Sequence, residues 1–166
     1  MSKQKAYTLD PSPEDYNFLL YGIACPDNQY FIVNAINDVL GIELRLEEYI
    51  DLSHRMGKDF KFSFYSFFDE ALNLEYNLIP NRSNYVAQEN NEKEGGDLFS
   101  LFNETVDESS KLIPELTKTD YLLLIKGDEH YHHSYKIAEA LKKIPEIITL
   151  QEIIPDQLSS KSNLIF

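Results

Sequence analysis

The sequence predicts a single α+β domain, spanning residues 1–166, in which an antiparallel sheet carries two helices on one face. The first observation is an apparent internal repeat, because residues 15–51 align with residues 120–156 at one constant offset without a gap. Each copy reads as strand, glycine turn, helix and strand. Two such β-α-β units around a central β-hairpin give the duplicated arrangement of ferredoxin-like domains. The matching pairs are Asp15/Asp120, Tyr16/Tyr121, Leu19/Leu124, Gly22/Gly127, Tyr30/Tyr135, Ile32/Ile137, Ala35/Ala140, Ile42/Ile147, Glu47/Glu152 and Asp51/Asp156.

The first unit is built from apolar runs with different periods. Residues 16–24 are apolar almost throughout, which predicts a buried strand. Over residues 29–40 the apolar positions follow helical spacing, so we expect a helix whose N-cap is Asn28 or Asp27. Residues 42–52 alternate imperfectly between apolar and charged side chains, as a half-exposed strand does.

A β-hairpin is expected between the two units. Phe60, Phe62 and Phe64 alternate with polar residues, and this phase is lost further along the run, which indicates two-sided burial or a bulge. A second alternating strand follows over residues 72–78. Residues 88–97 contain no apolar side chain, so we expect a mobile loop there.

The second unit opens with residues 120–127, the strongest buried-strand pattern in the chain. A helix is expected over residues 129–143 with Asp128 as its N-cap, followed by a strand over residues 147–153. From about residue 157 the chain is polar, which predicts a flexible tail. The apolar end, Leu164-Ile165-Phe166, either covers a groove of its own domain or docks on a partner or second protomer.

Charge and cysteine content restrict the possible functions. The chain has 15 Lys and Arg against 28 Asp and Glu, a net charge of -13 and a pI near 4.6. Such a field repels phosphate, so we expect neither nucleic acid nor an anionic membrane as a partner. Cys25 is the only cysteine, and no apolar leader or membrane-spanning run is present, so we expect a cytoplasmic protein.

Two short segments carry a resemblance to a family. Ile113-Pro114-Glu115 is followed by Asp120-Tyr121, and the chain closes with Ser160-Lys161-Ser162-Asn163-Leu164-Ile165-Phe166. In these segments the chain resembles the small bacterial proteins called the IPExxxDY family, although four residues rather than three separate Glu115 from Asp120. The resemblance implies a cytoplasmic protein of the Bacteroidetes type. It implies no activity, because that family is functionally uncharacterised.

Potential metal ligands are densest in the segment Asp128-Glu129-His130-Tyr131-His132-His133. On a helix His130 and His133 share a face, so a zinc or nickel site is geometrically possible. The only other histidine is His54, and acidic residues also favour a helix N-terminus through its dipole. A solvated helix start therefore explains the segment better than a metal site does.

The other candidate sites also have plain structural interpretations. Cys25 precedes a helix, where a thiol pKa can fall, but a single cysteine is more often a small buried apolar residue. The aromatic run at residues 60–68 has the alternation of a core strand, and the surrounding charge is wrong for RNA. The sequence thus identifies no catalytic residue and no cofactor. It favours a non-enzymatic interaction or regulatory module, as a homodimer or with a protein partner. The alternative is a metal- or small-ligand-binding protein or enzyme that uses His130 and His133.

Overall fold

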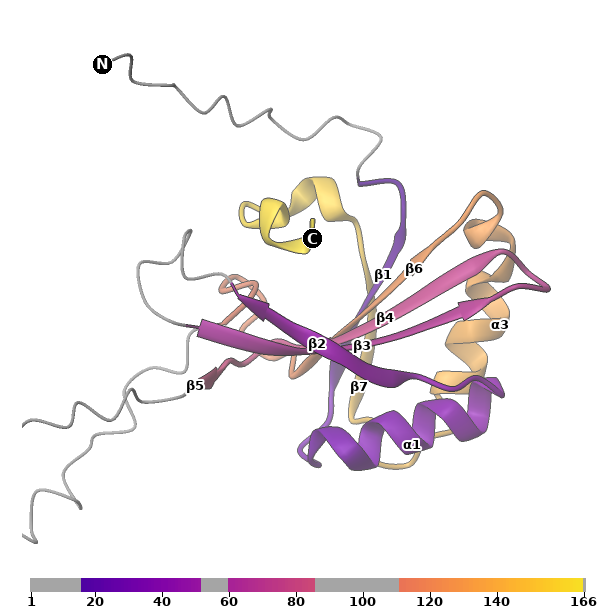
Figure 1. Cartoon of the computed structure of the whole chain (residues 1–166), viewed down its shortest axis with the longest axis horizontal. Coiled ribbons are helices and arrows are strands. Elements are labelled where there is room, and N and C mark those ends of the chain that lie inside the picture. The colour runs from indigo at the N-terminus through magenta and orange to yellow at the C-terminus, as the bar shows by residue number, and fades with distance from the viewer. Residues whose placement is uncertain (1–15, 52–59, 86–110, 166) are drawn as a thin grey trace, which may run out of the picture.

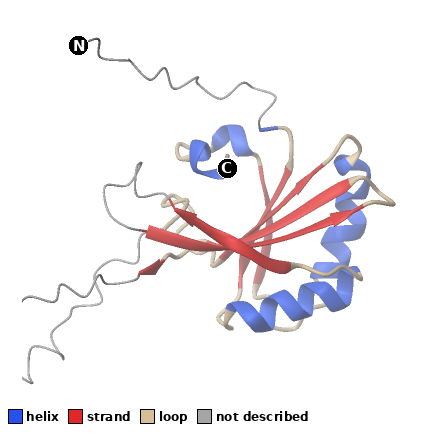
Figure 2. Ribbon diagram, viewed as in Figure 1, coloured by secondary structure: helices blue, strands red, loops and turns tan. Residues whose placement is uncertain are grey.

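The computed structural model describes residues 16–51, 60–85 and 111–165, which contain one antiparallel sheet and two α-helices (Figures 1 and 2). The order of strands is β2-β3-β4-β6-β1-β7, and β5 pairs with the start of β3. The predicted α+β class is therefore confirmed. The strands are β1 (Leu19–Ala24), β2 (Arg45–Asp51), β3 (Phe60–Asp69), β4 (Leu74–Pro80), β5 (Asn84–Tyr85), β6 (Tyr121–Lys126) and β7 (Thr149–Ile153), the α-helices are α1 (Gln29–Leu40) and α3 (His130–Leu141), and two 3₁₀ helices follow as η3 (Pro155–Gln157) and η4 (Lys161–Leu164).

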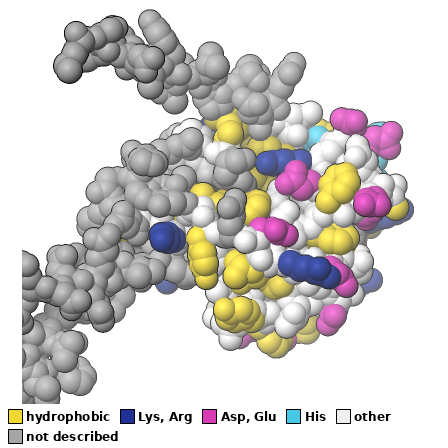
Figure 3. Space-filling model, viewed as in Figure 1, with side chains coloured by type: hydrophobic (Ala, Val, Ile, Leu, Met, Phe, Trp, Pro, Cys, Tyr) yellow, Lys and Arg dark blue, Asp and Glu magenta, His cyan; other side chains and the backbone are white. Residues whose placement is uncertain are grey.

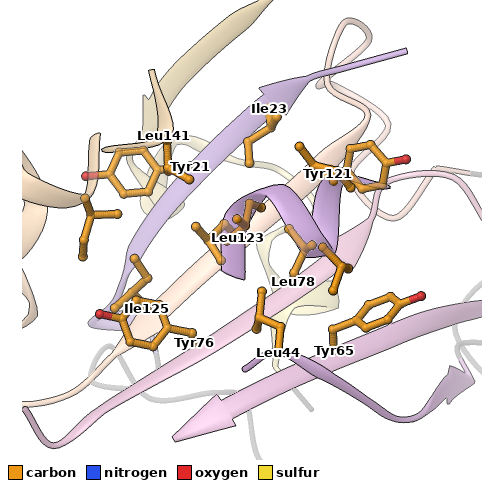
Figure 4. Packing of buried hydrophobic residues seen from close by; sticks show 14 of the residues in the cluster. Tyr21, Ile23, Leu44, Tyr65, Tyr76, Leu78, Tyr121, Leu123, Ile125 and Leu141 are labelled. Carbon is orange, nitrogen blue, oxygen red and sulfur yellow. The ribbon is translucent and has the colours of Figure 1, made fainter. Parts of the chain in front are cut away.

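Both α-helices pack on the same face of the sheet. The apolar faces of α1 and α3 join alternate residues of the strands in one buried cluster, part of which is drawn in Figure 4. The alternation arises because successive side chains of a strand point to opposite faces. The cluster includes Tyr21, Ile23, Ile32, Ile36, Tyr65, Leu78, Leu123, Ile125, Ile137 and Leu141.

The opposite face is covered by irregular chain. Leu112 and Ile113 pack there together with Leu158 and Leu164 of the C-terminal segment, against strand residues such as Phe62. The tail that we expected to be flexible from about residue 157 is thus folded over residues 157–165, and its apolar residues explain why. Burial of Leu164 agrees with the interpretation that the chain end covers its own domain, whereas Phe166 lies outside the described residues.

The hairpin is confirmed, with β3 and β4 paired from Tyr65/Leu78 to Asp69/Leu74. Asp69 Oδ1 accepts hydrogen bonds from the backbone N–H groups of Ala71 and Leu72, at 2.9 and 3.1 Å, and so holds the turn. The change of phase expected after Phe64 coincides with a register shift, which lies in β2 between Leu46 and Glu48. The expected mobile loop at 88–97 falls outside the described residues.

The ferredoxin-like duplication is not confirmed. The sequence repeat requires an offset of 105 residues, but β6 begins 102 residues after β1, and α3 begins 101 residues after α1. The connections also differ, because α3 joins strands that flank β1, whereas α1 joins β1 to β2 at the far side of β6, β4 and β3. Matching residues consequently occupy positions that are not equivalent.

Gly22 and Gly127 illustrate this difference. Gly22 lies inside β1, where an added Cβ would come within 2.7 Å of Ile153 Cδ1, so the glycine permits close packing rather than a turn. Gly127 follows β6 with φ of 145°, and its Cβ would lie 2.5 Å from the carbonyl oxygen of Asn73. The predicted glycine turn is therefore found only after the second of the two strands.

Asn81 organises the irregular chain on the second face. Its side chain is fully buried, Oδ1 accepts from Ile113 N at 2.8 Å, and Nδ2 donates to the carbonyl oxygens of Leu116 and Thr119 at 3.2 and 3.1 Å. Its backbone N–H donates to Asp120 O at 2.7 Å, and its carbonyl accepts from Leu112 N at 2.9 Å. One residue thus satisfies buried backbone groups across the whole segment.

Two hydrogen bonds hold the C-terminal segment against the irregular chain of the second face. Glu115 Oε1 accepts a hydrogen bond from Ser160 N at 2.7 Å, and Asn163 Nδ2 donates to Leu112 O at 2.9 Å. Burial alone raises the pKa of Glu115, but hydrogen bonds from the backbone and hydroxyl of Ser160 outweigh it and hold this pKa below its ordinary value. The carboxylate form therefore favours the folded tail.

Replacement Asn81→Ala should lower the free energy of unfolding by about 3 kcal/mol or more, because it leaves several buried backbone groups without partners. Urea unfolding followed by circular dichroism measures this loss. Asn163→Ala is the matched control, because it removes one partly buried hydrogen bond and should cost about 1 kcal/mol. A loss for Asn81→Ala no larger than that of the control would contradict the organising role of Asn81.

Glu115→Gln should reduce the dependence of stability on pH. Since the native pKa of Glu115 lies below the unfolded value of 4.5, its contribution is complete above that pH and disappears as pH falls through the native pKa. Because the carboxylate is exposed, we expect the loss of stability between pH 7 and pH 3 to shrink by less than about 1 kcal/mol in the variant. Urea unfolding at both pH values measures it, with Glu70→Gln in the β3–β4 turn as control; equal shrinkage in both variants would refute the assignment.

Candidate functional site

A cleft of about 610 Å³ opens where β1 leads into α1, beside the end of β4 and the start of β6. Three segments that are distant in the sequence therefore meet at one end of the sheet. The lining residues are Cys25, Pro26, Asp27, Asn28, Gln29, Tyr30, Pro80, Arg82, Ser83, Asp120 and Tyr121.

Residues at the start of β6 fix the β1–α1 turn. Asp120 Oδ2 accepts a hydrogen bond from Cys25 N at 3.0 Å, and the hydroxyl of Tyr121 donates to Asp27 O. Asn28 is the N-cap of α1, since its Oδ1 accepts from Phe31 N at 3.1 Å. This result confirms the predicted N-cap and shows that one wall of the cleft is rigidly held.

The polar groups of the cleft make it acidic. Its lining residues include the carboxylates of Asp27 and Asp120 but only one guanidinium, that of Arg82. The hydroxyl oxygen of Ser83 is buried and has no hydrogen-bond partner within the described part of the chain. A cationic group is therefore favoured as an occupant, while Arg82 and Ser83 offer hydrogen bonds to a neutral or mixed ligand.

Tyr30 and Tyr121 line the cleft, and together with the nearby Tyr49 and Tyr65 we call them the tyrosine cluster. Burial raises the pKa of Tyr65, and the nearby Tyr30 and Tyr49 raise it further. Burial also raises the pKa of Tyr121 to about 12, with smaller contributions from Cys25, Asp120, Asp27 and Tyr65. These effects place the hydroxyl of Tyr65 near those of Tyr30, Tyr49 and Tyr121, and the raised pKa values keep Tyr65 and Tyr121 protonated at neutral pH.

The tyrosine cluster has a buried half and an exposed half. Tyr65 and Tyr121 are buried, and Figure 4 shows their hydroxyl groups pointing to the same side. Tyr30 on α1 and Tyr49 on β2 are 65% and 53% exposed, so each presents an aromatic ring to solvent. On the face shown in Figure 3, hydrophobic side chains lie over α1 and β2 among acidic and basic ones.

Cys25 does not have the environment of a nucleophile. Its side chain is buried in the cluster below the helices, and burial raises its thiol pKa. A hydrogen bond with the backbone of Asp27 lowers this pKa, but the charges of Asp27, Asp120 and Glu146 raise it again. The thiol therefore stays protonated, and the structural interpretation of Cys25 as a buried apolar residue is favoured.

The histidines of the second helix point in different directions. The His130 ring is buried at 1% exposure and its Nδ1 bonds to Gly127 O, whereas His132 is exposed. His133 is half-buried, and the described residues contain no group of three or more His, Cys, Asp or Glu arranged to hold a metal ion. The N-cap of α3 is Glu129 rather than the expected Asp128, and it makes no side-chain cap. His54 lies outside the described residues.

The aromatic strand is confirmed as core. Phe60 and Phe62 are buried on the face covered by the tail, and Phe64 packs against the same cluster. Phe67 packs on the helix side, where its ring centroid lies 6.4 Å from that of Tyr76. Only Phe68, near the hairpin turn, is largely exposed among these phenylalanines. This arrangement leaves no row of aromatic rings for stacking bases.

The residues on which the family resemblance was based make hydrogen bonds between segments that are distant in the sequence. Glu115 binds the tail at Ser160, Asn163 binds Leu112, and Asp120 and Tyr121 bind the β1–α1 turn. Pattern analysis missed Asn81, which reads as an ordinary turn residue after Pro80, and it missed the cleft, which is formed by three separated segments. No local signal marks either feature.

No protein-family model, no curated protein and no solved structure matches this chain. Neither α1 nor α3, nor any other helix in the described ranges, has the length and apolar composition needed to cross a membrane.

The thiol of Cys25 should react slowly with a disulfide reagent such as DTNB while the protein is folded. Burial shields the sulfur and raises its pKa, so both access and the thiolate fraction are reduced. We expect the rate at pH 8 to rise at least about 100-fold when the chain is unfolded in urea, because the thiol then regains its ordinary exposure and pKa. The control is glutathione under the same conditions. Rapid stoichiometric labelling of the native protein at pH 7 would instead indicate a reactive cysteine.

Proposed function

We propose that this chain is a non-enzymatic interaction or regulatory module of the cytoplasm, which binds a segment of a protein partner over the tyrosine cluster and the adjoining cleft. The observation that carries the proposal is the exposure of Tyr30 and Tyr49, at 65% and 53%, beside a cleft of about 610 Å³. Large aromatic side chains next to a concavity are the commonest anchors of protein interfaces.

The construction of this surface supports recognition of a partner. Tyrosine combines a large apolar ring with a hydroxyl group, so it can contact both apolar and polar parts of a peptide. The hydrogen bonds of Asp120 and Tyr121 hold the wall beneath the tyrosine rings, which limits the entropy that binding would cost.

Charge indicates the chemistry of the partner. The cleft contains two carboxylates and one guanidinium, and the whole chain has a net charge of -13. A lysine- or arginine-containing segment would therefore be attracted, whereas nucleic acid and anionic membrane would be repelled. The resemblance to the IPExxxDY family agrees with a cytoplasmic protein and supplies no competing activity.

The alternative is a metal- or small-ligand-binding protein or enzyme. One observation favours a small ligand, because the cleft has the volume of typical ligand pockets and brings Arg82, Ser83 and Asp120 together. The version that uses His130 and His133 has less support, since the ring of His130 is buried and one of its nitrogens is engaged by Gly127. For a small ligand, the cleft is therefore a better candidate site than the two histidines.

Selection from a displayed library of random peptides tests the interaction proposal. We expect the immobilised protein to enrich peptides that contain Lys or Arg, and the double variant Tyr30→Ser/Tyr49→Ser to bind them at least about tenfold more weakly. Tyr135→Ser is the matched control, because Tyr135 is 75% exposed on α3, outside the tyrosine cluster. Its affinity should equal that of the wild type.

Two results would count against the proposal. Absence of enriched peptides, or equal weakening by Tyr135→Ser, would remove the tyrosine cluster as the binding surface. Native mass spectrometry of untagged protein then examines the alternative. A retained small molecule that is lost in Asp120→Asn would support a ligand in the cleft, and bound metal that is lost in His130→Ala/His133→Ala would restore the histidine site.

A further inference from the structure

In the described part of the sheet, the main path of six strands ends in the edge strands β2 and β7. An edge strand presents unpaired N–H and C=O groups at alternate residues, and such edges invite pairing unless they are protected. β2 is protected by the register shift between Leu46 and Glu48 and by the exposed charges of Arg45 and Glu47. β2 is thus protected against pairing with a strand of another molecule.

β7 lacks such a register shift and has only one charged residue, Glu152. It pairs with β1 in a continuous register from Leu20/Ile153 to Ala24/Thr149, and its sequence Thr-Leu-Gln-Glu-Ile contains no lysine, proline or glycine. Thr149, Gln151 and Glu152 are exposed. Within the described residues, the side of β7 that faces away from β1 has no neighbouring strand.

Two of the most exposed large apolar residues flank this edge. Ile148 and Ile154 are 74% and 57% exposed. Ile148 lies in a bend directly before the strand and is held against β1 because its N–H donates to Ala24 O at 2.9 Å, whereas Ile154 follows the strand with extended dihedral angles of -87° and 112°. Alternation along the strand places Ile154 on the same side as Leu150, which packs in the cluster below the helices.

We infer that β7 pairs antiparallel with β7 of a second copy of this chain, about a two-fold axis through Gln151. This inference goes beyond the proposed function, because it uses a surface separate from the tyrosine cluster. Ile148 and Ile154 lie three residues on either side of Gln151. In this register each Ile148 lies opposite the other copy's Ile154, Thr149 lies opposite Ile153, and Leu150 lies opposite Glu152.

The pattern is self-complementary, which favours a second copy over an unrelated strand. The register covers the exposed isoleucines of both copies with β-branched partners, and none of its pairs places like charges opposite each other. Neighbouring registers are worse. A slip of one residue per copy that centres the pair on Glu152 places two glutamates opposite each other, and the opposite slip, centred on Leu150, places Ile148 opposite Glu152.

A short edge makes a small interface. Five strand residues and their flanks fall at the low end of the area seen in specific complexes. We therefore expect a dimer that depends on concentration, with a dissociation constant on the order of 1–100 μM. Sedimentation equilibrium of the full chain at about 1 to 300 μM measures this dissociation constant, because these concentrations span its expected values.

Disulfide trapping tests the register. Gln151→Cys places identical thiols at the two-fold axis, where paired Cα atoms lie about 4.5–5.5 Å apart and a disulfide fits. Mild oxidation should convert this variant to a covalent dimer at least about tenfold faster than Thr149→Cys, whose two copies would lie several residues apart. Thr149 is also exposed on β7, so it is a matched control, and Cys25 is buried in both variants.

Ile148→Lys tests the flanking contacts. A lysine at the edge should abolish the dimer at every concentration measured while leaving the circular dichroism spectrum unchanged, because the residue it replaces is exposed. A wild-type chain that stays monomeric throughout, a dimer that survives Ile148→Lys, or equal trapping of the two cysteine variants would overturn the inference. A dimer that is abolished only by Tyr30→Ser/Tyr49→Ser would also overturn the inference, because it would assign self-association to the tyrosine cluster.

Discussion

The hydrogen bonds of Asn81 are the constraint on which much of this structure depends. A sheet with helices on one face needs a cover for the other, and here that cover is irregular chain whose backbone groups are buried without a helix or strand to pair them. The amide of Asn81 acts as the missing partner, with its oxygen on Ile113 N and its nitrogen on carbonyl oxygens further along the segment. With those groups satisfied, Leu112 and Ile113 can be fully buried and the C-terminal segment can pack over them.

The same residue links the cover to the cleft. The backbone N–H of Asn81 bonds to Asp120 O, which brings the end of β4 against the start of β6. Asp120 and Tyr121 then reach across to the turn before α1. The cleft thus lies at one end of the sheet, beside the loops that follow β1 and β4 and precede β6. The hydrogen bonds of Asn81 help to hold both the walls of the cleft and the irregular chain on the second face.

Periodicity in the sequence predicted the parts of the fold that depend on local pattern. The helix at residues 29–40 and the hairpin between β3 and β4 follow from spacing and turn chemistry alone, and the structure selects Asn28 from the two predicted N-caps. The duplication failed because matches such as Gly22 and Gly127 arise from unrelated requirements, close packing in one case and a positive φ in the other. The tail was misjudged because a mostly polar segment gives no sign of the groove that receives its buried residues Leu158 and Leu164. The cleft and Asn81 depend on contacts between distant segments, which local patterns do not contain.

The high negative charge of the chain affects which partners the β7 edge and the cleft can bind. Two chains of net charge -13 repel each other, so self-association is confined to places where charge is locally absent and apolar surface is present. β2 carries exposed charges and a bulge, whereas β7 between Ile148 and Ile154 has a single charged residue, Glu152, opposite a leucine in the symmetric register. The tyrosine cluster is different, because its rings adjoin carboxylates that attract an oppositely charged segment. One edge is therefore suited to a second acidic chain and the cleft to a basic one, so a single small domain can separate the two kinds of contact by charge.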